Sequence, residues 1–230
     1  MADVTVQGPD GSFGAYLAEP DRTPAPGLVV VQEIFGVNDV MRQTCDRYAQ
    51  QGYLAICPDL FWRIQPGVQI TDKTDAEWQQ AFDLMGKFDP DKGVEDLKAA
   101  LQHVRGLDAC AGKAGSVGYC LGGKMTFLMA TRSDADANVS YYGVGLDELL
   151  PEAGNITRPL LMHMASEDRF VPKEAQETIR ASLRDHPNVT IHVYEGNDHA
   201  FAREGGEHYD PEAARLANQR TAEFLERHLS

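Results

Sequence analysis

The sequence predicts an α/β protein with a mostly parallel central sheet and helices on both faces, in three layers. Short apolar runs alternate along the chain with amphipathic helical stretches, which is the pattern of βαβ units. The first such run, Leu-Val-Val-Val at 28–31, is apolar and β-branched throughout, as expected of a strand buried on both faces of a parallel sheet. We find no repeat, low-complexity segment or linker, so we expect one domain over residues 1–230.

The N-terminal half begins with a segment that alternates loosely between residues 4 and 19 and contains three glycines, which predicts an antiparallel hairpin at a sheet edge. After the strand at 28–31, Asn38 or Asp39 can cap a helix that ends at Gly52. The elements expected next are a strand at 53–57, an irregular segment at 60–73, and helices at about 75–88 and 91–105.

The C-terminal half continues the alternation with a strand at 116–119 and a helix at 121–131. Parallel strands joined by helices imply right-handed crossovers. The remaining elements are expected to be strands at 139–142, 159–164 and 189–194, and helices at 172–184 and 212–228.

Composition excludes several classes of function. The formal net charge is -14 and no basic stretch exists, which argues against binding to nucleic acid or to an anionic membrane surface. No apolar run approaches the length of a membrane span, and the N-terminus lacks the features of a secretory signal, so we expect a cytoplasmic protein. No C-x-x-C pair and no His/Asp/Glu spacing typical of zinc or iron is present, so we expect no metal and free thiols.

One motif suggests nucleophilic catalysis. The pentapeptide 118–122, Gly-Tyr-Cys-Leu-Gly, lies between a predicted strand and a predicted helix. This is the arrangement of a nucleophile elbow in the α/β-hydrolase fold, where a tight turn exposes the central side chain, here Cys120, above the sheet. The helix that follows favours a thiolate at its N-terminus, and the N–H of Leu121 can face a developing oxyanion.

A buried cysteine beside glycines that pack a helix onto a sheet is the alternative, and the motif alone leaves both interpretations open. The other three cysteines lack this setting. Cys45 lies on a helix, Cys57 ends a strand and Cys110 is placed in a loop, so we expect ordinary thiols in or near the core.

The order of later residues favours the catalytic interpretation. In α/β-hydrolases the acid and then the histidine follow the nucleophile along the chain. Asp168 lies in the loop after the strand at 159–164, although its neighbour Glu167 could take the same role. His199 follows the last predicted strand; a lone loop histidine is usually solvated, but this one stands where the base is required.

With these residues in place, the chain resembles the dienelactone hydrolase family of α/β-hydrolases from about Leu28 to the C-terminus. The segments that carry the resemblance are Gln-Glu-Ile-Phe-Gly at 32–36, Cys-Pro-Asp-Leu at 57–60, Gly-Tyr-Cys-Leu-Gly-Gly at 118–123, Tyr-Tyr-Gly at 141–143, Asp168 before Val171-Pro172, and His-Ala-Phe at 199–201.

The resemblance implies roles for individual residues. Cys120, Asp168 and His199 would form the catalytic triad, and the backbone N–H groups of Ile34 and Leu121 the oxyanion hole. Glu33 would hydrogen-bond the resting cysteine and oppose thiolate formation by like charge, which protects an exposed thiol from oxidation. The reaction would be acyl transfer through a thioester to Cys120, and it needs no cofactor.

The resemblance also implies how the substrate is bound. The family's reference lactone carries a carboxylate held by two arginines, of which Arg203 matches one. Trp78 stands where the second arginine belongs and Phe82 where the family has tyrosine, with Phe35 as a further substrate contact. These replacements imply a more apolar site that prefers a less charged lactone, ester or thioester. Arg63, just before Pro66-Gly67, could partly replace the missing arginine, but we interpret it as a solvated loop side chain.

The leading hypothesis is therefore a cysteine-dependent hydrolase of a small lactone or carboxylic ester. One alternative keeps the triad but acts on an unrelated neutral or activated ester, as an esterase or thioesterase. Another is a non-catalytic binding or redox-sensing module, because fold alone does not fix function. We expect a small-molecule substrate, no nucleic-acid or membrane partner, and a monomer or weak homodimer.

Overall fold

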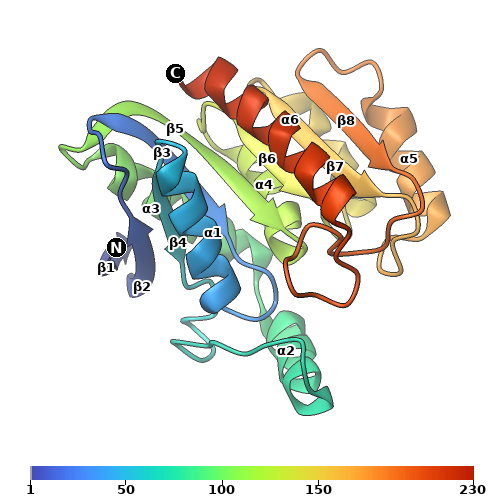
Figure 1. Cartoon of the computed structure of the whole chain (residues 1–230), viewed down its shortest axis with the longest axis horizontal. Helices are drawn as coiled ribbons and strands as arrows, with labels where there is room; N and C mark the ends of the chain where they lie inside the picture. Colours follow the sequence, from blue (N-terminus) through green and yellow to red (C-terminus); the bar gives the residue numbers. More distant parts are fainter. Residues whose placement is uncertain (1) are drawn as a thin grey trace. The chain divides into compact units, whose positions relative to one another are not determined.

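The computed structural model describes residues 2–230, which form two compact units, one ending at Gly115 and the other beginning at Ser116 (Figure 1). Each unit has strands with helices packed on them, so the predicted α/β class is confirmed. The expectation of a single domain stays a prediction, and the two units are described one at a time.

The strands of the first unit lie in the order β1-β2-β4-β3. β1 and β2 form the predicted antiparallel hairpin, β2 is antiparallel to β4, and β3 is parallel to β4. The apolar run in β3 is fully buried, as its sequence predicts. The bounds are β1 (Ala2–Gly8), β2 (Gly11–Ala18), β3 (Ala25–Val31) and β4 (Leu54–Pro58).

Helices cover both faces of these strands. Cys57 of β4 exchanges a hydrogen bond with Cys45 of α1, so α1 lies on the face that Cys57 occupies. Gly27 pairs with Leu54 and approaches Val104 of α3. Leu54 and Cys57 are three residues apart on one strand and point to opposite faces, which places α3 opposite α1. The helices are α1 (Asp39–Gln50), α2 (Asp75–Lys87) and α3 (Pro90–Arg105).

The strands of the second unit are parallel and lie in the order β5-β6-β7-β8, with β5 entering this unit at Ser116. β5 starts at Cys110, six residues earlier than expected, so the prediction that Cys110 lies in a loop is wrong. β6 ends at Tyr141 because Tyr142 turns out of the strand with a φ of 37°. The bounds are β5 (Cys110–Tyr119), β6 (Asn138–Tyr141), β7 (Leu160–Ala165) and β8 (Val189–Tyr194).

Helices again cover both faces. The Ser140 hydroxyl donates to the carbonyl of Gly123 in α4 at 2.8 Å, while Tyr141, the next residue, donates to Asn218 in α6 at 2.9 Å. Adjacent strand residues point to opposite faces, so α6 lies in front of the strands and α4 behind them, as Figure 1 shows. The helices are α4 (Leu121–Arg132), a 3-10 helix (Asp147–Asn155), α5 (Lys173–Leu183) and α6 (Pro211–Leu229).

The 3-10 helix was not expected, because a segment with an internal Pro151 and tighter winding lacks the 3.6-residue periodicity that predicts an α-helix. None of the helices formed by residues 2–230 combines the length and apolar character needed to cross a membrane.

A buried polar network joins α6 to the strands. The Nδ1 atom of His163 lies 2.8 Å from the Tyr194 hydroxyl, and its Nε2 atom lies 2.9 Å from the Thr221 hydroxyl. Burial lowers the pKa of His163 well below its usual value, so the ring is neutral. His163 therefore gives α6 one hydrogen bond, through Thr221, and β8 another, through Tyr194.

Candidate active site

Cys120 lies at the turn between β5 and α4. It is the N-cap of α4 and has a φ of 58°, the left-handed region that a side chain with a Cβ rarely adopts. Its backbone N–H donates to the carbonyl of Tyr141 at 3.1 Å, which holds the turn against β6. Such strain persists where the surrounding structure enforces it, and it is typical of functional turns.

Two glycines make this turn possible. A Cβ added at Gly118 would lie 2.1 Å from the carbonyl oxygen of Gly122, and one added at Gly123 would lie 2.5 Å from that of Tyr141. The strand and helix therefore approach more closely than any side chain allows. Because α4 begins at Leu121, its first N–H groups have no partner inside the helix, and Cys120 is the residue that immediately precedes them.

The structure brings His199 and Asp168 together. Nδ1 of His199 lies 3.0 Å and 2.9 Å from the two carboxylate oxygens of Asp168, and both residues are buried. Glu167, the alternative acid, instead pairs with Lys173 at 2.7 Å. The Asp168 side chain also accepts the backbone N–H of Phe170 at 2.9 Å, which fixes its orientation towards the histidine.

The pKa of His199 reflects its interactions with both Cys120 and Asp168. Burial by itself lowers the pKa of His199, but the negative charge of Cys120 and the hydrogen bond to Asp168 outweigh burial and raise this pKa to about 10. The imidazole is therefore protonated at neutral pH, with Asp168 on one side and Cys120 as its other partner. A thiolate is the reactive form of cysteine, and an imidazolium is a proton donor for a leaving group.

Aromatic rings surround the imidazole. The rings of Tyr142 and Phe170 meet it edge-on, with centroids 5.1 Å and 4.8 Å away. Phe170 is 40% exposed although it contacts the buried histidine. Ala200, which follows His199, has a φ of 63°, so the histidine sits beside a second strained residue.

The loop that carries Glu33 and Ile34 belongs to the first unit and follows β3. Both residues are almost fully buried, at 4% and 3% exposure. The amide of the buried Gln32 donates to the carbonyl of Glu33 at 3.2 Å and accepts the N–H of Leu60 at 3.1 Å. Gly36 lies so close to the backbone of Val68 that a Cβ would meet its carbonyl oxygen at 1.9 Å. Gln32, which has no predicted role, thus organises the loop that carries Glu33 and Ile34.

The residues expected to bind substrate in the first unit form one aromatic cluster. Trp78 meets Phe35 edge-on at 5.1 Å and stacks on Phe82 at 5.5 Å. Phe82 is 45% exposed, so one face of the cluster is open to solvent. In the second unit, Arg203 is half-buried and its backbone N–H donates to Ala200 at 2.9 Å, which places it one turn after His199.

Arg63 differs from its interpretation as a solvated side chain. Its guanidinium binds Asp10 at 2.9 Å and also contacts the fully buried Asp96. The ring of Trp62 stacks beneath it at 4.4 Å. A guanidinium engaged by two carboxylates is a structural group, so it is not available to replace the arginine that Trp78 displaces.

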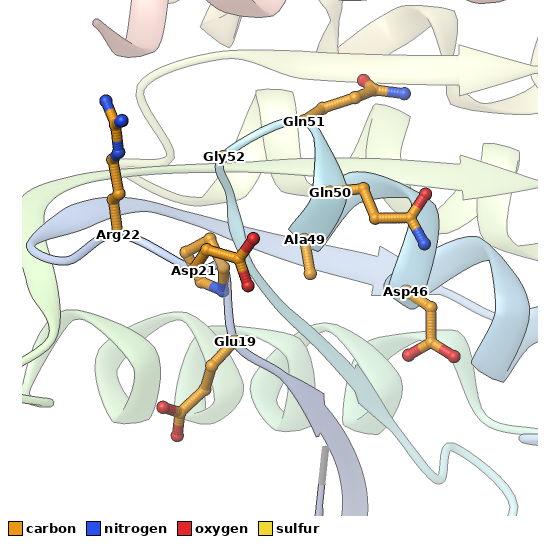
Figure 2. Close-up of a pocket in the computed structure, with 9 residues that line it drawn as sticks. Glu19, Asp21, Arg22, Asp46, Ala49, Gln50, Gln51 and Gly52 are labelled. Carbon is orange, nitrogen blue, oxygen red and sulfur yellow. The ribbon is translucent and has the colours of Figure 1, made fainter.

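A surface pocket of about 450 Å³ in the first unit lies beside the C-terminal end of α1 (Figure 2). Figure 2 shows the carboxylates of Glu19 and Asp46 on its walls, with the Arg22 guanidinium pointing away from them. None of the candidate catalytic residues lines it. Within residues 2–230, no group of three or more His, Cys, Asp or Glu side chains is arranged to hold a metal ion.

Comparison with known proteins identifies the family of this chain. Residues 13–229 match the model of the "Dienelactone hydrolase family". A candidate carboxymethylenebutenolidase from Azospirillum brasilense is 57% identical over the whole of both chains, and the carboxymethylenebutenolidase of Pseudomonas putida is 41% identical over 96% of this chain and 94% of its own.

Solved structures show the same fold. The crystal structure of a candidate dienelactone hydrolase from Klebsiella pneumoniae superposes with a TM-score of 0.86 at 29% identity, covering 99% of this chain and 98% of that one. The α/β-hydrolase fold and the hydrolysis of ester or lactone bonds follow from these relationships. Because sequence and fold agree over nearly the full length of the chain, it is a member of the dienelactone hydrolase family.

Proposed function

We propose that this chain hydrolyses a small lactone or ester by covalent catalysis, with Cys120 as the nucleophile, His199 as the acid and base, and Asp168 as the group that orients His199. The observation that carries the proposal is the buried contact between His199 and Asp168, together with the charge of Cys120 that raises the pKa of His199 to about 10. A thiol, an imidazole and a carboxylate in this order are the parts that acyl transfer requires.

The first half of the reaction forms a thioester. The Cys120 thiolate adds to the carbonyl carbon, and the carbonyl oxygen becomes an oxyanion. When the tetrahedral intermediate collapses, the bond to the leaving oxygen breaks and His199 gives its proton to that oxygen. In a lactone the leaving oxygen stays attached to the acyl chain, so the ring opens and nothing departs at this stage.

The second half releases the acid. Once Cys120 is acylated it carries no charge, and the main influence that raises the pKa of His199 is gone. Burial then lowers this pKa towards a range in which the neutral imidazole takes a proton from water. The resulting hydroxide attacks the thioester, and the thiolate of Cys120 is regenerated beside the protonated histidine.

The resemblance to the family adds supporting groups to this proposal. The N–H of Leu121 stands at the start of α4, where a helix dipole favours negative charge. We assign Ile34 as the second oxyanion donor and Glu33 as the group that regulates the thiol. The assignment of Glu33 is tested by chemical labelling: Glu33→Gln should increase alkylation of Cys120 in the resting enzyme, because a carboxylate opposes a nearby thiolate.

The substrate class follows from the aromatic cluster and from the relatives. Two relatives are named carboxymethylenebutenolidase, so a lactone is the first substrate to test. Trp78 and Phe82 offer an apolar, partly exposed surface where the family's reference pattern has an arginine and a tyrosine. We therefore propose that neutral lactones and esters are processed at least as well as the carboxylate-bearing dienelactone.

The experiment measures hydrolysis of dienelactone and of a neutral aryl ester by the wild-type protein and by Cys120→Ala. We expect turnover of both by the wild type, its loss in the variant, and a covalent acyl adduct detectable by mass spectrometry on rapid quenching. Full activity of Cys120→Ala would refute the nucleophile. The expected monomer or weak homodimer is tested separately by light scattering over a range of concentrations.

A further inference from the structure

The two loops that carry Asp168 and His199 are irregular, so each needs further contacts that hold its catalytic side chain in place. Asp168 lies between β7 and α5, and His199 lies between β8 and α6. Backbone bonds join the loops near the strands: Ser166 donates to the carbonyl of Tyr194 at 3.0 Å, and Glu167 donates to that of Asn197 at 2.8 Å. The pairing of the strands thus extends as far as residues 167 and 197, one step short of the catalytic pair.

Beyond this point, the side chain of Asp198 joins the two loops. Its Oδ1 atom accepts the backbone N–H of Arg169 at 3.0 Å and that of His199 at 2.6 Å. One carboxylate oxygen therefore binds the residue that follows Asp168 and the catalytic histidine itself. Any displacement of this carboxylate moves both loops.

Arg169 holds the carboxylate from the other side. Its Nε donates to Oδ2 of Asp198 at 2.8 Å, and its Nη2 lies 2.7 Å from the same atom. Nη2 also contacts His208, further along the loop. Burial alone raises the pKa of Asp198, but the bonds from Arg169 and the two backbone N–H groups lower it to about 2, so the carboxylate stays ionised.

The backbone strain at Ala200, beside His199, explains why these contacts are needed. Ala200 has a φ of 63°, a left-handed conformation that persists in a residue with a Cβ only when neighbouring contacts enforce it. The Asp198 bond to the N–H of His199 is the contact immediately before this residue. Without it, the backbone at 199 and 200 is free to relax, and the imidazole moves with it.

We propose that Asp198 and Arg169 are positioning residues, which clasp the Asp168 and His199 loops together and set the geometry of the catalytic pair. This inference rests on the proposed function, since it assumes that Asp168 orients His199 as the acid and base. Neither side chain touches substrate in this scheme; the guanidinium acts only through the carboxylate, and the carboxylate acts only through the two backbone N–H groups.

The test compares Asp198→Ala, Asp198→Asn, Arg169→Ala and the double alanine variant, with kcat and KM measured on one ester. We expect Asp198→Ala to lower kcat by roughly 10- to 100-fold, as displacement of a catalytic group by about 1 Å does, with KM unchanged. Asp198→Asn should recover part of the loss, because an amide oxygen still accepts both N–H groups. Arg169→Ala should cost less than Asp198→Ala, and nothing further when Asp198 is already alanine.

A matched control lies at the first residue of α5. Lys173→Ala removes the ion pair with Glu167, which is also 2.7 Å long, and the hydrogen bond to the carbonyl of Ser166. Both contacts stay within residues 166–173, so this variant should leave kcat unchanged. If both Asp198 variants kept the wild-type kcat, or if kcat fell as much in Lys173→Ala as in Asp198→Ala, the proposed positioning role would be wrong. An additive further loss in the double variant would also overturn it. Cys120→Ala is assayed beside them, and its retained activity would instead refute the proposed function.

Discussion

The Nδ1 atom of His199 lies 2.9 Å from Oδ2 of Asp168, and the side chains of both residues are more than nine-tenths buried. Because water is largely excluded from this pair, the carboxylate and the imidazole keep each other in one ionisation state and hold the ring in one orientation. Nδ1 is committed to Asp168, so the ring can serve the reaction only through Nε2. That atom is the one available for proton exchange with the sulfur, the leaving group and water.

Asp168→Asn should leave the fold intact and lower kcat by roughly 10³- to 10⁴-fold, because an amide neither favours the imidazolium nor enforces the correct tautomer. The measurement is steady-state kinetics, with circular dichroism to confirm the fold. Glu167→Gln is the control from the neighbouring position, and it should keep nearly wild-type activity because Glu167 pairs with Lys173 and not with His199.

Cys120→Ala should lower the pKa of His199, since the charge of Cys120 is the largest influence that raises it. An NMR titration of the histidine ring protons in wild-type and variant protein checks this. Removal of the thiol leaves Asp168 in place, so the decrease reports the sulfur alone. An unchanged pKa would mean that Asp168 is sufficient and that acylation does not convert His199 into a base.

Stability should depend on pH through the same residue. The pKa of His199 is raised in the folded state to about 10 from an ordinary value of 6.5. Protonation therefore stabilises the fold fully below about pH 6.5, and this contribution is lost as the pH rises through about 10. Urea unfolding of the wild type and of His199→Gln at several pH values measures it. The advantage of the wild type should shrink across this window, and a constant difference would contradict the assignment.

Gly118→Ala should destabilise the second unit severely, because its Cβ would overlap the carbonyl of Gly122 at 2.1 Å. A backbone atom cannot rotate away as a side chain can, so we expect a loss of more than about 3 kcal/mol in the free energy of unfolding. Gly154→Ala is the matched control in the same unit, since a Cβ there meets nothing within 4 Å. Chemical denaturation of both variants makes the comparison, and equal stabilities would show that the elbow is not closely packed.

Trp78→Arg should shift substrate preference towards anions. The guanidinium would replace an apolar ring and could pair with a substrate carboxylate. We expect kcat/KM to rise for dienelactone and to fall for a neutral aryl ester, measured side by side. Gln79→Arg introduces the same charge at the adjacent exposed position of α2 and should change neither value. A similar response of both variants would indicate a general charge effect on a protein of net charge -14.

The sequence alone was sufficient for features that depend on neighbouring residues. Alternating apolar runs and helical stretches predicted the α/β class, and the two glycines around Cys120 predicted a tight turn that the structure contains. Boundaries were less predictable: β5 begins at Cys110 although the local composition around Gly112 resembles a loop. The 3-10 helix at 147–155 went unpredicted because short, tightly wound helices carry no clear periodic pattern.

Tertiary structure decided which of several plausible side chains meet. Asp168 and Glu167 are adjacent and chemically alike, but the direction of one loop turns the first towards His199 and the second towards Lys173. Asp198 and Arg169 stand beside the catalytic residues in the sequence without any motif to mark them, and only the fold closes them into one cluster. Local patterns depend on residues a few positions apart, whereas these contacts join residues about thirty positions apart and exist only after the strands have paired.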